Sequence, residues 1–309
     1  MNRSTCRWIT SLLLLLAVQL SASGLREIRI TQSWSAGMSY PTDLALDSQG
    51  RAWVVDGLNR RLLVFSAGLE TPREIALPTV GKALGIDIAD DRVWLTDTAG
   101  PRLLVLDLEG HLQREITLPP DCDPVDVLAT PRGVVIADND NQRLLMLDGQ
   151  DRLVRTIGNG GGKAESLVPI SEAHPPECRT GNRPAEFSFP GILARLEKDF
   201  MVVDVLGGRI QVFQPDGSLS HIYGMFGADG ESLFRPKGVC GCRVDGGVWI
   251  TDSYTGLIHG YDDYGKRQES LALDGAPWRL EGPTAISCCG EGIWVVDCRA
   301  GKLYRSVLK

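Results

Sequence analysis

The sequence predicts an all-β protein, a six-bladed β-propeller, from three observations. A hydrophobic strand that ends in Asp occurs six times, at Asp56, Asp97, Asp138, Asp204, Asp252 and Asp297. Neighbouring copies lie 41, 41, 66, 48 and 45 residues apart, and a period in the forties built from strands is typical of propeller blades. The last copy has no fourth strand after it, whereas a strand-like segment near the start of the chain belongs to no repeat.

Each repeat except the last contains four expected strands in the same order. The innermost strand often begins at Pro, as at Pro41, Pro124, Pro190, Pro236 and Pro283. A turn rich in Gly or Asp leads to the second strand, which carries Trp three positions before its Asp in four copies, at Trp53, Trp94, Trp249 and Trp294. A third and a fourth, outermost strand complete the blade, and the periodic Trp residues are expected in the core between blades.

The repeated Asp residues have a structural explanation, since a catalytic group is not needed in every blade. Five positions after each Asp, the chain has Arg61, Arg102, Arg143, Arg209, Leu257 and Lys302. A carboxylate in a tight turn accepts backbone N–H bonds and can contact such an Arg. We therefore expect an Asp–Arg contact in most blades.

The segment Arg26–Ile30 is expected to complete the last blade. Its Arg-Glu-Ile sequence repeats that of two expected outermost strands, Arg73–Ile75 and Arg114–Ile116. Placed beside the last strand of the chain, it would close the ring. Closure removes exposed strand edges, which otherwise pair with other chains.

These repeats resemble the NHL-repeat propellers, whose blades share Pro-x-Gly, a Val-x-Asp strand end and an Arg that opens the next strand. The resemblance covers residues 26–309. Asp43, Asp126 and Ile192 stand where the pattern has Gly. The resemblance implies the fold and leaves the function open.

Residues 1–23 are predicted to be a signal peptide, and residues 24–309 a single propeller domain. Arg3 and Arg7 precede an apolar run from Ile9 to Leu20, which small residues follow. The run is short for a membrane span, and we expect none in the mature chain. The protein is therefore expected to be secreted or periplasmic.

The charge of the chain argues against nucleic acid as a partner. Removal of the predicted signal takes away two of the 32 basic residues and leaves 30 against 39 acidic ones. No basic cluster interrupts this acidic background. Proteins that bind nucleic acids need such a cluster to contact phosphates.

Residues 158–185 are predicted to be an insertion between blades three and four. The segment is rich in Gly and Pro and breaks the period. It contains His174, the one His with a route to a site.

A disulfide is predicted to tether this insertion. Because Cys122 and Cys178 lie in successive connections on one face of the ring, we predict a Cys122–Cys178 bridge.

Five further cysteines fall in blades five and six: Cys240, Cys242, Cys288, Cys289 and Cys298. Cys240 and Cys242 alternate along one strand and so share a side, whereas Cys288 and Cys289 point to opposite sides. Structural disulfides or buried thiols are favoured over a thiolate metal site or a redox role. The sequence does not choose among the pairings.

Asp43 and Asp126 are the leading candidates for a binding or metal site, with Asp87 as a weaker third. They lie on innermost strands, which line the central channel. Two carboxylates at the channel mouth could hold Ca²⁺ together with carbonyl groups and water. The simpler alternative is a solvated pair that hydrogen-bonds to neighbouring backbone.

Trp278 and Arg279 lie between blades five and six, on the face that carries the connections between blades. They are candidates for contact with a partner, although a Trp that fills the gap between blades fits equally well. Related secreted propellers include lyases that use His and lactonases that hold a divalent cation, and neither residue pattern maps onto this chain.

The sequence favours an extracytoplasmic binding or scaffolding protein that holds a protein, glycan or small molecule on this face. The alternative is a cation-dependent hydrolase or lyase, similar to a lactonase or an amidating lyase, with its site at the channel mouth.

Overall fold

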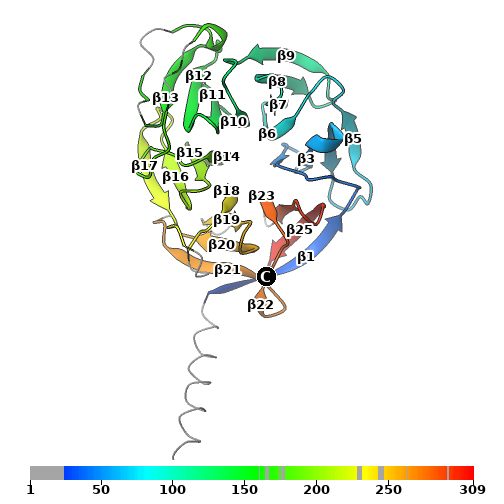
Figure 1. The fold of residues 1–309 in the computed structure, drawn as a ribbon. Coiled ribbons are helices and arrows are strands. Elements are labelled where there is room, and N and C mark those ends of the chain that lie inside the picture. Colours follow the sequence, from blue (N-terminus) through cyan, green and yellow to red (C-terminus); the bar gives the residue numbers. More distant parts are fainter. Residues whose placement is uncertain are drawn as a thin grey trace, which may run out of the picture.

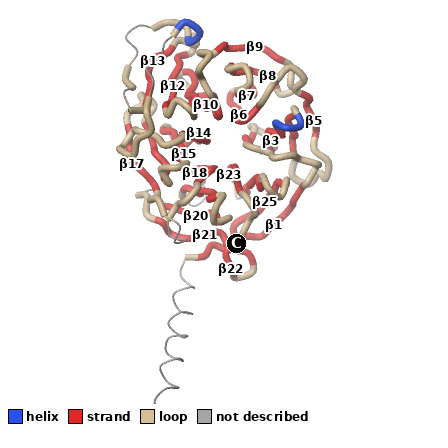
Figure 2. Tube along the Cα trace, in the orientation of Figure 1, coloured by secondary structure: helices blue, strands red, loops and turns tan. Residues whose placement is uncertain are grey.

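The computed structural model describes residues 24–309, except 160, 164–166, 174, 176–177, 228–231, 243–246, 263 and 291. These residues form a closed ring of antiparallel blades around a central space (Figure 1). Within this part of the chain, regular structure other than strand is limited to two short 3-10 turns, Gly57–Asn59 and Ile170–Glu172 (Figure 2). No helix among the described residues is long and apolar enough to cross a membrane. The predicted signal peptide lies outside the described residues.

Four blades are separate four-stranded sheets, each with its strands in chain order from the centre outwards. Blade one contains β2 (Leu44–Leu46), β3 (Ala52–Asp56), β4 (Arg61–Phe65) and β5 (Arg73–Ala76). Blade two contains β6 (Ala83–Ala89), β7 (Arg92–Asp97), β8 (Arg102–Asp107) and β9 (Leu112–Thr117). Blade three contains β10 (Pro124–Thr130), β11 (Gly133–Asp138), β12 (Arg143–Asp148) and β13 (Leu153–Ile157). Blade four contains β14 (Pro190–Leu196), β15 (Asp199–Asp204), β16 (Arg209–Phe213) and β17 (Leu219–Tyr223).

Blades five and six share one nine-stranded sheet. Blade five contains β18 (Pro236–Gly241), β19 (Val248–Asp252), β20 (Leu257–Tyr261) and β21 (Arg267–Leu273), with the short β22 (Ala276–Pro277) beside β21. Blade six contains β23 (Pro283–Cys289), β24 (Gly292–Asp297), β25 (Lys302–Leu308) and the N-terminal strand β1 (Leu25–Trp34). The prediction of a six-bladed, all-β propeller is confirmed.

The N-terminal strand closes the ring as predicted. β1 pairs antiparallel with β25 from Ile28, opposite Leu308, to Trp34, opposite Leu303 (Figure 1). The pairing is longer than predicted, and the first residues of β1 also pair in parallel with β21 of blade five. This second pairing, which the sequence did not indicate, merges two blades into one sheet.

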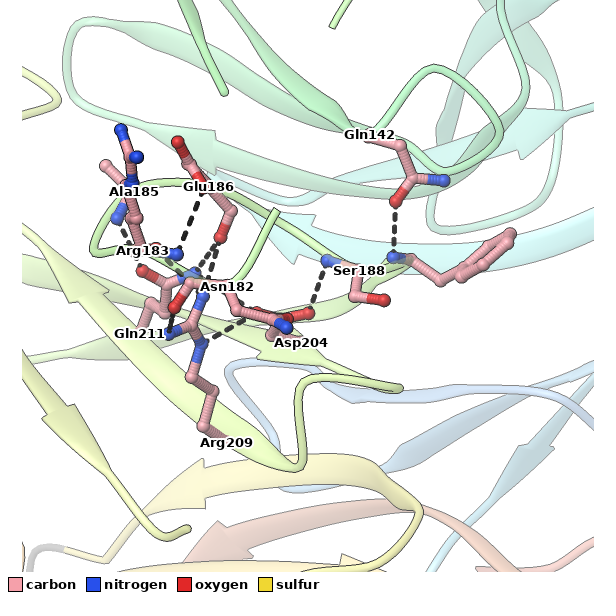
Figure 3. Close-up of polar contacts among 10 residues, drawn as sticks. Gln142, Asn182, Arg183, Ala185, Glu186, Ser188, Asp204, Arg209 and Gln211 are labelled. Atoms are coloured by element: carbon pink, nitrogen blue, oxygen red, sulfur yellow. Dashed lines mark hydrogen bonds and ion pairs between the residues drawn. The ribbon is translucent and has the colours of Figure 1, made fainter. Parts of the chain in front are cut away.

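The predicted Asp–Arg contacts are present, and blade four shows how they work (Figure 3). The Asp204 carboxylate accepts the backbone N–H of Ser188 at 2.7 Å and the Nε–H of Arg209 at 2.8 Å. Arg209 also donates to the carbonyl oxygens of Asn182 and Glu186, at 2.7 and 2.9 Å. The same pair therefore holds both the turn and the chain that leads into the blade.

The hydrophobic core lies between neighbouring blades. The four periodic Trp residues are at most 8% exposed, as predicted. The repeated Asp residues are at most 1% exposed, which fits their structural role. Where Leu257 replaces Arg, Asp252 instead accepts the backbone N–H groups of Phe234, Arg235, Tyr254 and Thr255.

Candidate functional site

A cavity of about 1500 Å³ occupies the centre of the ring. Its lining runs from Asp43 to the tips of the turns that follow the innermost strands, including the exposed Ser48, Asp91, Lys198 and Gly290. We call this side of the ring the hairpin face, and the side that carries the connections between blades the loop face. The sequence placed Asp43 and Asp126 at the loop-face ends of innermost strands, and the cavity extends from Asp43 towards the hairpin face.

Close contact between innermost strands explains why this cavity extends towards the hairpin face. At the level of Asp43, a Cβ added to Gly85 would lie 2.2 Å from the Oδ1 atom of Asp126. A Cβ added to Gly238 would lie 2.8 Å from the Cα atom of Ala285. The strands of neighbouring blades thus come together at this level, and the cavity begins beyond it.

The cavity wall is acidic. Its lining contains seven acidic residues, Asp43, Asp47, Asp87, Asp90, Asp91, Glu197 and Asp199, and two basic ones, Arg195 and Lys198. Apolar side chains such as Leu44, Ile88 and Ile286 fill the space between them. Field lines concentrate in such a concave site, so the wall favours a neutral or cationic ligand over an anion.

Asp43 lines the cavity, whereas Asp126 is buried beside Gly85 and does not line it. The two oxygens of Asp43 accept the N–H groups of Leu44 at 2.8 Å and Ile86 at 2.9 Å. Asp126 Oδ2 accepts the N–H of Leu193 at 2.7 Å. Each carboxyl group therefore joins its own blade to the next one. The expected solvated pair is instead almost fully buried, at 4% and 1% exposure.

Burial favours the protonated form of both carboxyl groups. Burial and, to a smaller extent, the nearby charge of Asp87 raise the pKa of Asp43 to about 7, while hydrogen bonds from backbone and from Asp126 act in the opposite direction. Burial and the charge of Asp43 likewise raise the pKa of Asp126. Asp126 Oδ1 is buried and accepts no N–H group among the described residues. A proton on either carboxyl group would let the two hydrogen-bond, which two ionised carboxylates cannot do.

Asp87, the third predicted residue, forms a two-pronged ion pair with Arg195 across the cavity. The Nη1 and Nη2 atoms of Arg195 lie 2.8 and 2.6 Å from the Asp87 oxygens. Blade three lies between these two residues, and its Ala129 hydrogen-bonds to both of them. The Ala129 N–H donates to Asp87, and the Ala129 carbonyl oxygen accepts from Arg195. Arg195 was not predicted from the sequence, although a charged residue on an innermost strand was a signal that could have found it.

The residues do not fit a divalent cation as the sequence suggested. Three of the four oxygens of Asp43 and Asp126 already accept backbone N–H groups. In the described part of the chain, no group of three or more His, Cys, Asp or Glu side chains is arranged to hold a metal ion. Ca²⁺ prefers six or more oxygen ligands, so no reaction step is assigned to a cation here.

The remaining predicted contact residues lie away from the cavity floor. Trp278 is 6% exposed and packs edge-on against Tyr304, so it fills the gap between blades and is not a surface contact. Arg279 is exposed and donates to the carbonyl oxygen of Thr255 at 3.0 Å. His174 lies outside the described residues.

Cys122 and Cys178 are both buried near the ion pair that Arg143 forms with Asp138. Burial raises the pKa of each thiol, and the charges of Asp138 and Arg143 act on both. These surroundings do not decide the predicted Cys122–Cys178 disulfide, which stays a prediction. Peptide mapping without reductant would show whether the two cysteines are joined.

Comparisons with known proteins place the chain by its fold. No protein-family model matches it, and no curated protein matches it in sequence. Many solved structures match, including virginiamycin B lyase from Staphylococcus aureus, with a TM-score of 0.58, 15% identity and coverage of 91% of this chain and 100% of that one.

Two other solved structures are similar to the same degree. A calcium-binding protein, regucalcin, from Agrobacterium tumefaciens has a TM-score of 0.59 and 14% identity, over 93% of this chain and 96% of that one. A gluconolactonase from Xanthomonas campestris has a TM-score of 0.59 and 15% identity, over 94% and 93%. At these identities the likeness concerns the fold, so the chain is a six-bladed propeller of the type seen in these proteins.

Proposed function

We propose that this propeller is a hydrolase or lyase that acts on a small neutral or cationic molecule in the central cavity. The observation that carries the proposal is the buried carboxyl pair Asp43–Asp126: burial raises both pKa values, and Asp43 lines a cavity large enough for an organic ligand. In this proposal the two carboxyl groups share a proton. Ionisable groups with strongly shifted pKa values cluster at functional sites.

The pair suits general acid–base catalysis near neutral pH. With the pKa of Asp43 at about 7, the pair holds and releases a proton in the range where enzymes work. The protonated pair donates to a leaving oxygen, and the ionised pair accepts a proton from water or from a carbon acid. Arg195, whose side chain is 44% exposed, orients a carbonyl or hydroxyl group of the substrate.

The similar structures are compatible with a hydrolase or lyase and do not indicate a particular substrate. The similar propellers include a lyase and a gluconolactonase by name, and a third is named as calcium-binding. Membership of the NHL-repeat family and export by residues 1–23 belong to the same proposal. In that case the enzyme works outside the cytoplasm.

Turnover of a panel of lactones, esters and elimination substrates tests the proposal. We expect activity that changes with pH around 7 and persists in the presence of a chelator. Asp126→Asn should lower kcat by about 100-fold and remove the inflection near pH 7, because the amide cannot exchange the shared proton. Glu74→Gln, an exposed control in blade one, should retain activity.

Activity in Asp126→Asn equal to that of the wild type would rule out this role for the pair. If no substrate in the panel is turned over, a second candidate function takes its place, that of a binding protein that uses the loop face. One observation favours it. Met225, Phe226 and Tyr254 are 72%, 56% and 66% exposed, and Phe234 packs against both aromatic rings.

A further inference from the structure

Four cysteines line the central cavity: Cys240, Cys242, Cys288 and Cys289. The first two belong to blade five and the last two to blade six. The sequence alone left their pairing open. The direction in which each side chain points, and the register between β18 and β23, now distinguish them.

In blade five, Cys240 and Cys242 face blade six. A Cβ added to Gly241, which lies between them, would meet the Cδ1 atom of Leu196 at 3.0 Å and the carbonyl oxygen of Arg195 at 3.4 Å, both in blade four. Successive residues of a strand point to opposite sides, so the two cysteines point the other way. They are 6% and 4% exposed in the core between blades five and six.

In blade six, Cys288 faces blade five and Cys289 faces away from it. The Sγ atom of Cys289 would lie 3.7 Å from a Cβ added to Gly50 in blade one. Its neighbour Cys288 therefore points to the opposite side and packs against the core that contains Cys240 and Cys242. Three of the four thiols thus lie in one interface.

The contact between blades two and three shows which residues of two innermost strands come together. Gly85 and Asp126 lie side by side at the narrow level of the channel. Asp87, two residues after Gly85, reaches Ala129, three residues after Asp126, and accepts its N–H at 2.8 Å. The side chain two residues beyond the narrow level thus contacts the backbone N–H of the residue three beyond that level in the next blade.

The same register applies to blades five and six. Gly238 and Ala285 are the pair at the narrow level. Cys240 is two residues after Gly238, and Cys288 is three residues after Ala285. The side chain of Cys240 is therefore directed at the backbone of Cys288, whose own side chain points into the same interface. Cys242 lies on the same side, one side-chain position nearer the hairpin face.

We infer that Cys240 and Cys288 form a dithiol site on the cavity wall that undergoes thiol–disulfide exchange with an organic disulfide. One thiolate attacks the organic disulfide and forms a mixed disulfide, and the other thiolate displaces the second organic thiol. The protein loses two S–H bonds and gains one S–S bond, while the organic disulfide is reduced to two thiols. The bridge links the innermost strands of blades five and six beside the cavity.

Peptide mapping of the protein treated with oxidised glutathione tests this site. Reduced protein is incubated with oxidised glutathione, alkylated, digested without reductant and analysed by mass spectrometry. We expect the Cys240 and Cys288 peptides to be cross-linked in the wild type, in Cys242→Ala and in Cys289→Ala. Oxidation should also raise the Tm of the wild type by several degrees, and not that of Cys288→Ala.

The variant without Cys242 makes the test decisive, since a Cys242–Cys288 bridge cannot form in it. If Cys288 in Cys242→Ala carries only glutathione or the alkylating agent, the inference is wrong. A wild-type map in which Cys240 is joined to Cys242 or Cys289 would also overturn it. The Tm readout applies to folded protein alone, so each variant is first checked for a cooperative thermal transition.

Discussion

Replacement of Arg143 by Met is expected to lower the free energy of unfolding by about 3–5 kcal/mol, because it leaves a buried carboxylate without its cation. Arg143 is fully buried, and its Nε atom lies 2.6 Å from the Oδ2 atom of Asp138, which is also fully buried. Its other nitrogens donate to Asp121 at 3.2 Å and to the carbonyl oxygen of Pro175 at 3.1 Å. The same side chain thus holds the Asp turn of blade three and the insertion that follows the blade.

The equivalent change in blade two provides the control. Arg102 makes the same contact with Asp97, but its side chain is 24% exposed, so water can solvate the carboxylate when Arg102 becomes Met. A loss of about 1 kcal/mol is expected there. Urea denaturation of both variants measures the difference. Equal losses would show that burial does not increase the contribution of the blade-three ion pair to the free energy of unfolding.

Replacement of Asp126 by Asn is expected to stabilise the protein above pH 7 relative to the wild type. The pKa of Asp43 is raised in the folded state to about 7, so the folded wild type binds a proton that the unfolded chain releases near its ordinary value of 3.8. This proton contributes stability that is fully present below the ordinary value and is lost as pH rises through about 7. The loss amounts to about 4 kcal/mol for the full shift.

In the Asp126→Asn variant, the new amide group would donate a permanent N–H bond to Asp43 in place of the shared proton. The amide oxygen can still accept the N–H of Leu193, as Asp126 Oδ2 does at 2.7 Å. The free energy of unfolding of Asp126→Asn minus that of the wild type should therefore increase between pH 5 and pH 8. Urea titrations at these pH values measure it, and the subtraction cancels the contribution of the other carboxylates.

Asp43→Asn is the matched variant and should behave in the opposite way. Both oxygens of Asp43 accept backbone N–H groups, at 2.8 and 2.9 Å, so an amide at this position must set its NH₂ group against one of these donors. We expect a loss of about 1–3 kcal/mol at every pH. If the two variants have the same stability at pH 8, the shared proton is misassigned.

Much of the fold could be predicted from the sequence because the same motif recurs in the blades. Each blade uses the same local devices, a polar hairpin turn, an Asp in the next turn and an Arg five residues later. Six copies of one weak signal therefore reinforce one another. The Asp204–Arg209 contact and the closure by Ile28–Trp34 followed from this pattern. The parallel pairing of Leu25–Glu27 with β21 did not, because nothing in the repeat encodes it.

The candidate site was predicted only in part. Asp43, Asp126 and Asp87 were visible as carboxylates on strands that line the channel. Their meeting across Gly85 was not visible, since it depends on the close approach of strands more than 40 residues apart in the chain. Arg195 was missed because its partner, Asp87, lies 108 positions away in the sequence.

The sequence by itself determined the number of blades, the order of their strands and the structural role of the repeated Asp residues. These depend on contacts within a blade, where neighbours in space are near in the chain. The tertiary structure alone decided which face holds the cavity, that Asp43 and Asp126 are buried and that Cys240 and Cys288 lie in one interface between blades. Those features depend on the stagger between blades and on the loss of water around buried charges, and both arise only when the ring closes.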